Sequence, residues 1–372
     1  MAFGQYELRI LQISSASSFG GGERHVADLI NALAERGHDL YLAVRSHSPL
    51  LEHVHLSPAQ IKTLPLRNAL DVQSAHELAR FVRRHEIEVV HAHMARDYSL
   101  AAYATRRNRD TKFIVTRHVL FPLNRLHRQT LAGAHRVIAV SNAVASELRK
   151  ERITRDDQIT VVHNGIDTDR FAQLLNNFDR AEFLRSKGLP TDGLFVGSIG
   201  ELRTLKRHDD FIRAAAKIAD RFPQTHFVLA GVDTSPSGEV RKQLEHLVKQ
   251  LRLNDRFHFL GWLDDAEKLL AALDVFVSAS ETESFGLAIA EAMAAGTAVV
   301  ATATDGAQEV IDDQQSGLLV PIGDPTGLAE AIAALLASAE QRKQIGRLAQ
   351  REVARRFSLQ RMVDEIERIY AG

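Results

Sequence analysis

The chain has 372 residues, of which 45% are apolar and 25% are charged, and its formal net charge is −1. This composition is that of a soluble globular protein, and the length predicts about two domains. Cysteine is absent, the N-terminus lacks the basic start and apolar run of a signal peptide, and no stretch of roughly 18 uncharged apolar residues occurs. We therefore expect a cytoplasmic protein with no nucleic-acid partner, and the inner face of a membrane is the second expected location.

Short β-rich runs alternate with helical patterns along the whole chain, which predicts an α/β fold with parallel sheets covered on both faces. The polar stretch from Asn176 to Asp192 reads as the link between two similar Rossmann-like units. We expect domains over residues 1–180 and 190–356, followed by a last helix over residues 357–372. The predicted strands are Leu8–Ile13, Asp39–Val44, Glu88–Ala92, Lys112–Thr116, His135–Val140 and Gln158–Val162 in the first half, and Gly193–Ile199, Gln224–Ala230, Arg256–Leu260, Asp274–Val277, Ala298–Ala301 and Gly317–Val320 in the second. The clearest predicted helices are Glu23–Arg36, Val72–His85 and Asn142–Glu151.

A run of three glycines, Gly20 to Gly22, follows the first predicted strand and precedes a helix. Glycine lets the backbone approach a ligand closely, and a helix start favours phosphate. Taken alone, this run is better explained as a tight turn in front of a helix.

Two histidines, His91 and His93, alternate at the end of a predicted strand and so share one face. Such a pair invites a metal interpretation, but no third ligand is evident nearby, and most such pairs are structural. His93, nearer the carboxyl end of the strand, is the better site candidate. Asp167 and Asp169 form a DxD pattern, which binds a metal ion in some enzymes, but they follow a turn sequence and are interpreted as turn residues.

The most informative feature is a pair of glutamates, Glu283 and Glu291, with seven residues between them across a loop-to-helix junction. Glu283 lies in the loop at the carboxyl end of a buried strand, where open α/β sheets bind ligands. Glu291 lies about one turn into the helix. The backbone N–H groups around Phe285–Leu287 suit an anion or sugar hydroxyls. A nucleotide sugar, with hydroxyls at both ends and phosphate between them, would satisfy such a site.

Two further segments follow strand ends in the second half. Residues 200–208 carry Arg203, Lys206 and Arg207, cations that can neutralise a pyrophosphate leaving group, although a charged helix start is about as good an explanation. The segment from Gly306 to Glu309 is either part of the site or a plain helical capping turn.

A basic segment extends from Arg96 to Arg155, where 13 Lys or Arg residues stand against 4 Asp or Glu, an excess of nine positive charges. Aromatic and apolar residues are interleaved with these charges, namely Tyr98, Tyr103, Phe113, Phe121 and Leu123. A solvated basic face is the simpler interpretation. A surface for an anionic acceptor or for peripheral contact with a lipid membrane is the alternative, which the local imbalance slightly favours.

Together these features resemble the large group 1 family of retaining GT-B glycosyltransferases over nearly the whole chain. The matching positions, in chain order, are Gly20–Glu23, His93, Ala139–Ser141, Asn164–Asp167, Lys206, Glu283 with Glu291, Gly306 with Glu309, and Ser316–Val320. The resemblance implies two Rossmann-like domains that face a central cleft, the first for the acceptor and the second for the donor nucleotide sugar. It also implies that the last helix crosses back to the first domain.

The resemblance further implies roles for individual residues. Glu291 would bind the ribose hydroxyls, Glu283 would bind the donor sugar, and Lys206 would face the diphosphate. The implied catalytic residues are His93, Lys206 and Glu283, the donor-binding residues are Gly21, Gly22, Arg203, Glu283, Ser284, Phe285, Gly286, Leu287 and Glu291, and the acceptor-binding residues are Glu23 and His118. The resemblance implies no cofactor and no metal ion.

One position departs from the family pattern. The family usually has Arg directly after the strand-end glycine, where this chain has Glu201, so that Arg203 or Arg207 would supply the missing cation. The function we expect is retaining transfer of a sugar from a UDP- or GDP-linked donor to an acceptor hydroxyl of an envelope glycan or glycolipid, by a metal-independent front-face mechanism. The alternatives are a GT-B-fold sugar-nucleotide epimerase and a non-catalytic sugar-nucleotide-binding relative, the latter favoured by Glu201 alone.

Overall fold

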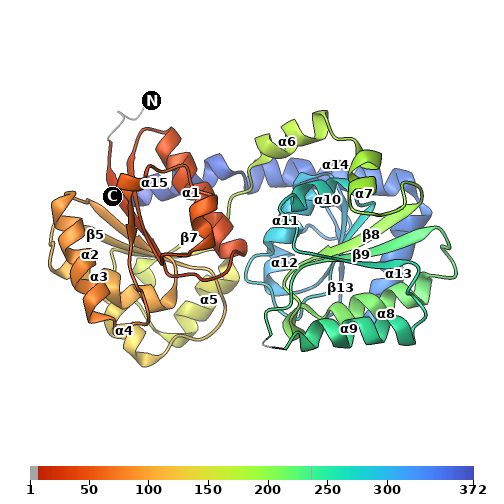
Figure 1. Cartoon of the computed structure of the whole chain (residues 1–372), viewed down its shortest axis with the longest axis horizontal. Helices are drawn as coiled ribbons and strands as arrows, with labels where there is room; N and C mark the ends of the chain where they lie inside the picture. The colour runs from red at the N-terminus through yellow and green to blue at the C-terminus, as the bar shows by residue number, and fades with distance from the viewer. Residues whose placement is uncertain (1–6, 236) are drawn as a thin grey trace. The chain divides into compact units, whose positions relative to one another are not determined.

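The structure is a computed structural model that describes residues 7–235 and 237–372. The chain forms two compact units, each built around its own parallel sheet (Figure 1). Unit 1 comprises Met1–Gly165 and Leu359–Gly372, and unit 2 comprises Ile166–Ser358. The first six residues, which belong to the first predicted domain, lie outside the described part of the chain.

Unit 1 contains a parallel sheet with seven strands among the described residues, in the order β3-β2-β1-β4-β5-β6-β7. Helices α1 and α15 pack on one face, and α2 and α3 lie on the other (Figure 1). The strands are β1 (Arg9–Ser14), β2 (Asp39–Val44), β3 (Ile61–Thr63), β4 (Val89–Ala92), β5 (Lys112–Arg117), β6 (Arg136–Ala139) and β7 (Ile159–Val161). The α-helices are α1 (Gly21–Glu35), α2 (Val72–Arg84), α3 (Tyr98–Arg106), α4 (Arg125–Leu131), α5 (Asn142–Glu151) and α15 (Leu359–Ala371).

Unit 2 repeats the plan with six parallel strands in its described residues, in the order β10-β9-β8-β11-β12-β13. Helices α8, α9 and α13 bury their apolar side chains on one face of this sheet. The strands are β8 (Leu194–Ile199), β9 (Thr225–Ala230), β10 (Phe257–Gly261), β11 (Val275–Ser278), β12 (Ala298–Thr302) and β13 (Leu318–Val320). The α-helices are α6 (Thr168–Asn176), α7 (Arg180–Ser186), α8 (His208–Ile218), α9 (Glu239–Gln250), α10 (Ala266–Ala272), α11 (Leu287–Ala294), α12 (Asp305–Val310), α13 (Pro325–Ala337) and α14 (Ala339–Arg356).

The predicted α/β class with two doubly wound parallel sheets is confirmed, and each predicted strand is present within a few residues of its expected bounds. Strand β3, only three residues long at the edge of its sheet, has no counterpart among the predicted strands. The chain enters unit 2 at Ile166 rather than near residue 180. The reason is that α6 and α7, placed in the first domain or the link by the sequence, contact α10 of unit 2.

Helix α15 completes unit 1 although it is the last segment of the chain. Its apolar face, which includes Val363 and Ile366, joins the core formed by α1 and the sheet. The Arg36 guanidinium at the end of α1 lies 2.6 Å from carboxylate oxygens of both Asp364 and Glu367. This packing brings Tyr370, which is fully buried, into hydrogen-bond contact with Gln12 of β1 and His91 of β4.

Candidate functional site

In each unit the strand order reverses at one point of the sheet, and predicted site residues follow the strands there. In unit 1 the reversal lies between β1 and β4, which are followed by α1 and by His93. In unit 2 it lies between β8 and β11, which are followed by Lys206 and Glu283. Open α/β sheets bind ligands outside the carboxyl ends of their strands at such a point. We describe these two places as the unit 1 site and the unit 2 site.

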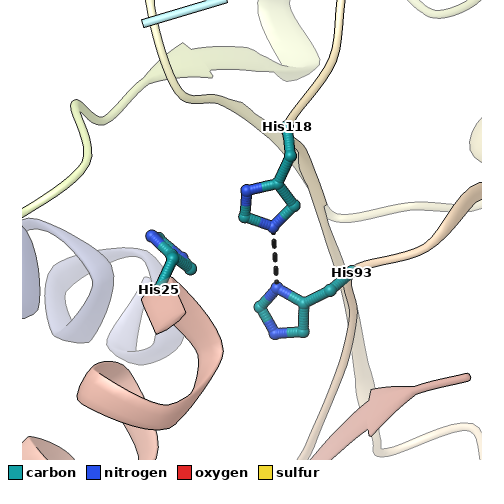
Figure 2. Close-up of side chains that lie close together, drawn as sticks. All are labelled: His25, His93 and His118. Carbon is teal, nitrogen blue, oxygen red and sulfur yellow. Dashed lines mark hydrogen bonds between the residues drawn. The ribbon is translucent and has the colours of Figure 1, made fainter. Parts of the chain in front are cut away.

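The unit 1 site contains three histidines from separate segments, His25 in α1, His93 directly after β4 and His118 directly after β5 (Figure 2). His93 Nδ1 lies 3.3 Å from His118 Nε2, and the ring centroids of His25 and His118 are 4.8 Å apart. The side chains meet because β1, β4 and β5 are adjacent strands whose carboxyl ends share one edge. We call these three residues the histidine cluster.

A chain of hydrogen bonds below the cluster fixes the orientation of His93. Gln12 Nε2 donates to the hydroxyl of Tyr370 at 3.1 Å, so Gln12 Oε1 faces His93 Nε2 at 2.7 Å. An amide oxygen only accepts, so His93 carries its proton on Nε2. The lone pair of His93 Nδ1 therefore points into the histidine cluster.

The same chain continues away from the cluster. The Tyr370 hydroxyl lies 2.6 Å from His91 Nδ1, and His91 Nε2 lies 2.7 Å from Thr116 Oγ1. Having accepted from Gln12, the Tyr370 hydroxyl donates to His91. His91 thus has a structural role. This agrees with the choice of His93 over His91 as the site candidate in the sequence.

Burial keeps these imidazoles neutral. It lowers the pKa of His91, His93 and His118 well below 6.5, and the neighbouring imidazoles lower it further. Burial also lowers the pKa of His25 to about 4, while the side chain of Asn164 opposes this shift to a smaller extent. At neutral pH the histidine cluster therefore presents uncharged nitrogen atoms.

The predicted glycine run forms the start of α1 beside this cluster. Gly20 is the N-cap residue, and its N–H donates to Glu23 Oε2 at 3.0 Å, which is the glutamate half of a capping box. Burial raises the pKa of the Glu23 carboxyl, against hydrogen bonds from its own backbone N–H and from that of Gly20. A Cβ on Gly22 would lie 3.9 Å from His118 Cγ. The glycine run thus brings the backbone close to His118. One carboxylate oxygen of Glu23 accepts a hydrogen bond at the start of α1.

In the unit 2 site, Lys206 and Glu283 form an ion pair. Lys206 lies in a 3-10 turn, η5 (Thr204–Lys206), and its Nζ is 2.6 Å from Glu283 Oε1. Ser280 Oγ donates to the same oxygen at 2.8 Å. The Glu283 side chain is 15% exposed and that of Lys206 is 28% exposed. A cation and a carboxylate are thus held together, partly shielded from water, at the carboxyl edge of the sheet.

The backbone beside Glu283 is fixed by two glycines. A Cβ on Gly306 would lie 2.6 Å from Glu283 O and 2.8 Å from Phe285 N, so only glycine lets α12 approach this loop. Helix α12 itself is capped by the Thr304 hydroxyl. Gly286 has φ +94° and caps α11, whose N-terminal N–H groups begin at Leu287. Glu291 lies in α11 and is half-buried.

The two arginines near Glu201, Arg203 and Arg207, form ion pairs with carboxylates other than Glu283. Arg203 lies 3.3 Å from Glu201 Oε2 in an exposed pair. Arg203 also lines a surface pocket of about 330 Å³ between α8 and α9. Arg207 lies 2.7 Å from Asp210 and 3.7 Å from Glu281. Of the three cations predicted to face a diphosphate, the structure brings Lys206 alone into contact with Glu283.

Two interpretations from the sequence have clear outcomes. Asp167 Oδ1 accepts from the N–H of Arg170 and caps α6, which agrees with its interpretation as a turn residue. Among the aromatic and apolar residues interleaved in the basic segment, Tyr98, Phe113 and Leu123 are buried in the core. Phe121 is 53% exposed, so it remains as a surface aromatic of that segment. No helix in the described ranges is long and apolar enough to cross a membrane.

Sequence reasoning missed Gln12, Tyr370 and the role of His25. No third metal ligand is evident near His91 and His93 in the sequence. The fold brings two histidines from distant segments, His25 and His118, to His93. A signal for His25 was present, since it follows the glycine run at the start of α1. Nothing in the local sequence connects Tyr370 to β4.

Comparisons with known proteins agree with this architecture. Residues 179–352 match the family model described as glycosyl transferases group 1, and residues 19–170 match that described as glycosyltransferase family 4. The chain is 28% identical to N-acetyl-alpha-D-glucosaminyl L-malate synthase of Bacillus anthracis, over 96% of this chain and 95% of that protein. It is 30% identical to the lipopolysaccharide core biosynthesis glycosyltransferase LpsE of Rhizobium meliloti, over 95% of this chain and 96% of that protein.

Among solved structures, Anabaena HepE in complex with UDP and glucose superposes with a TM-score of 0.84. The sequence identity is 23%, and the match covers 98% of this chain and 100% of HepE. The two proteins share their fold.

Proposed function

Because the chain belongs to the group 1 glycosyltransferases and has their GT-B fold, we propose that it transfers a sugar from a nucleoside diphosphate to an acceptor hydroxyl. The observation that carries this proposal is the Lys206–Glu283 pair at the unit 2 switch point, 2.6 Å apart and partly buried. A diphosphate requires a cation and a sugar requires a hydrogen-bond acceptor, and the pair offers both at one place. The UDP and glucose bound to HepE support a donor of this class.

On the donor side, the proposal assigns roles to both ends of the Glu283–Glu291 segment. Glu283 binds hydroxyls of the transferred sugar, with Ser284 and the N–H groups of the α11 start, from Phe285 through Gly286 to Leu287. Glu291 binds the ribose hydroxyls, and Lys206 faces the diphosphate. Arg203 is a second cation for the phosphates once it leaves Glu201. The support is positional, since these residues follow β8 and β11 at the switch point.

In unit 1, the proposal places His93 beside the transferred sugar, with Gly21 and Gly22 close to the diphosphate. Glu23 and His118 belong to the acceptor side. The hydrogen bond from His93 to Gln12 supports this role, because it directs the Nδ1 lone pair into the histidine cluster, where a sugar hydroxyl would replace His118 Nε2 as its donor. Tyr370 acts through Gln12 and is therefore a positioning residue.

The reaction we propose is front-face transfer with retention. The acceptor oxygen attacks the anomeric carbon while the bond from that carbon to the phosphate oxygen breaks. The departing phosphate oxygen takes the proton of the acceptor hydroxyl, so the step balances without a protein nucleophile. The protein then acts by positioning the reactants and by stabilising charge on the diphosphate.

Donor binding is tested by a thermal-shift screen with UDP, GDP and ADP and with their common sugar conjugates. A ligand present at 100 times its Kd should add about 2.7 kcal/mol of stability. We expect one nucleotide series, UDP or GDP, to raise Tm, and Glu291→Ala to lose the shift. Absence of a shift with every nucleoside diphosphate at millimolar concentration would contradict the proposal.

Transfer is favoured over the two alternatives. An epimerase with this fold would turn over its donor without an acceptor, and the matching family models and relatives are of transferases and a synthase. A non-catalytic relative would bind the donor without turnover, and Glu201 is the feature in its favour. Donor consumption with and without a panel of acceptors separates all three.

Transfer should continue in excess EDTA. The physical reason is that Lys206 and the start of α11 supply the charge stabilisation that a divalent ion supplies in other sugar transferases. The measurement is release of nucleoside diphosphate after chelation. Activity that disappears with EDTA and returns with Mg²⁺ or Mn²⁺ would contradict metal independence.

The acceptor we propose is an envelope glycan or glycolipid, which the name of the Rhizobium relative supports. If the basic segment 96–155 contacts a membrane, the protein should co-sediment with anionic liposomes and be released as salt rises. Phe121→Ser should weaken this binding, because it removes the exposed aromatic of the segment. Equal sedimentation with anionic and neutral liposomes, or none at low salt, would leave the basic segment as a solvated face.

A further inference from the structure

We propose that the histidine cluster is a binding site for a borderline transition-metal ion such as Zn²⁺, and that this ion and a sugar at His93 exclude each other. The metal site is inferred from the structure of unit 1 alone. The mutual exclusion of ion and sugar rests on the proposed function, because both would use the lone pair of His93 Nδ1. The ion is an inhibitor in this account, so the proposal is consistent with transfer in EDTA.

The spacing of the ring nitrogens fits a tetrahedral ion. Two nitrogens bound to one such ion at about 2.0–2.1 Å lie about 3.4 Å apart. His93 Nδ1 and His118 Nε2 are 3.3 Å apart before any ion is present. One nitrogen from each of the three histidines lies within 4.8 Å of the other two, so His25 has only to move inward. In the described ranges this is the one group of three or more such ligands that lies close enough together.

In the described part of the chain, the ring nitrogens of His25 are buried without a well-formed hydrogen bond, and the proposed function does not explain this. It is 3% exposed, and neither of its ring nitrogens makes a hydrogen bond of good geometry within the described residues. Burying a polar group without a partner is unfavourable, so such groups are rare in folded proteins. Figure 2 shows the His25 ring beside the other two. The side chain of Asn164 is the polar group that acts on His25, so a turn of His25 toward a bound ion alters this one contact.

The protonation states suit metal binding. Zinc binds the unprotonated nitrogen of a neutral imidazole. His93 carries its proton on Nε2, where Gln12 accepts it, so Nδ1 is available. The hydrogen bond between the two rings is then donated by His118 Nε2, and this proton moves to Nδ1 of the same ring when the ion binds. The ion thus takes the place of the proton that lies between His93 Nδ1 and His118 Nε2.

The outer contacts also resemble those of metal-bound histidines. Such histidines donate their second ring N–H to a carbonyl, a carboxylate or a water molecule, which fixes the tautomer. The amide oxygen of Gln12 does this for His93, and Tyr370 orients Gln12 from the opposite side. The nearby Arg117 donates to the backbone carbonyl of Phe121, and its positive charge also acts on His118.

Binding is tested with Co²⁺, whose visible d–d absorption reports tetrahedral nitrogen ligation, on full-length protein stripped with a chelator. We expect one equivalent to give this absorption and one equivalent of Zn²⁺ to displace it. His25→Phe keeps an aromatic ring but removes both nitrogens, and should weaken Co²⁺ binding at least about tenfold. His25→Asn is the second variant if the first misfolds. His258→Phe is the matched control, because it breaks the separate His226–His258 pair of unit 2, and should leave binding unchanged.

The metal site and its competition with the sugar are tested by different outcomes. No tetrahedral Co²⁺ absorption in the wild-type protein, or equal absorption in the wild type and in folded His25 variants, would overturn the metal site. For the competition with the sugar, we expect one equivalent of Zn²⁺ to lower acceptor-dependent turnover at least tenfold and EDTA to restore it. Cobalt bound at the cluster with no effect of Zn²⁺ on turnover would overturn the proposed role of His93 and leave the metal site standing.

Discussion

Replacing Lys206 by alanine should lower kcat for sugar transfer by roughly 10²–10³, the usual cost of removing one group that stabilises a developing anion. Negative charge grows on the diphosphate as the glycosidic bond breaks, so the contact strengthens in the transition state and its loss appears in kcat. Glu201 stands where the family usually has Arg, and Arg203 and Arg207 are engaged with Glu201 and Asp210. Lys206 should therefore carry more of this stabilisation than either arginine. The measurement is steady-state kinetics at saturating donor.

The Lys206–Glu283 pair requires a control, since Lys206→Ala also leaves a carboxylate without its partner. Lys187→Ala is a close match, because Lys187 pairs with Asp265 at 2.9 Å in the same unit at similar exposure. It should change kcat by less than about twofold, within the effect expected away from the site. Thermal unfolding of both variants shows whether they remain folded. If Lys206→Ala keeps kcat near wild type and Arg203→Ala does not, the diphosphate cation is Arg203.

Glu283→Gln should lower kcat by roughly 10–100-fold, with little change in the affinity for free nucleoside diphosphate. The substitution keeps the size of the side chain but removes the charge that strengthens hydrogen bonds to sugar hydroxyls. Glu291→Ala should do the opposite and weaken nucleoside diphosphate binding roughly 10–100-fold, since its proposed partner is the ribose. Calorimetric titration with the nucleotide and steady-state kinetics separate the two effects.

Glu281→Gln is the matched control for this pair of variants. Glu281 lies two residues from Glu283, is 50% exposed and has Arg207 3.7 Å away. Its loss should leave both nucleotide binding and kcat near wild type. The assignment would be reversed if Glu283→Gln abolished nucleotide binding while Glu291→Ala left it intact.

The fold was predictable from the sequence because buried parallel strands are short, continuous apolar runs between turn residues. Segments such as Val275–Ser278 and Ala298–Thr302 are of this kind, and both are fully buried. Strand β3 was not predictable, since Ile61, Lys62 and Thr63 form an edge strand with little burial. The boundary at Ile166 was missed because it depends on tertiary packing of α6 and α7, which local patterns do not contain.

The sites were predictable where their residues lie close in sequence or follow strand ends. Glu283 was predicted to follow a strand, which the structure confirms, and the fold brings Lys206 into contact with it. The histidine cluster was only half predictable. His93 was identified, but His25 joins it through strand order, and Tyr370 reaches Gln12 only because the last helix returns to unit 1. Contacts of this kind arise from topology, which no local spacing encodes.

The central claim is sugar transfer from a nucleoside diphosphate sugar with retention. The direct measurement is proton NMR of the anomeric signals while the enzyme consumes its donor, with and without an acceptor, in EDTA. The account predicts that nucleoside diphosphate is released at a rate that depends on the acceptor. It also predicts that the new glycosidic bond has the anomeric configuration of the donor. Acceptor-independent conversion of the donor into an epimer, or a product of inverted configuration, would contradict it.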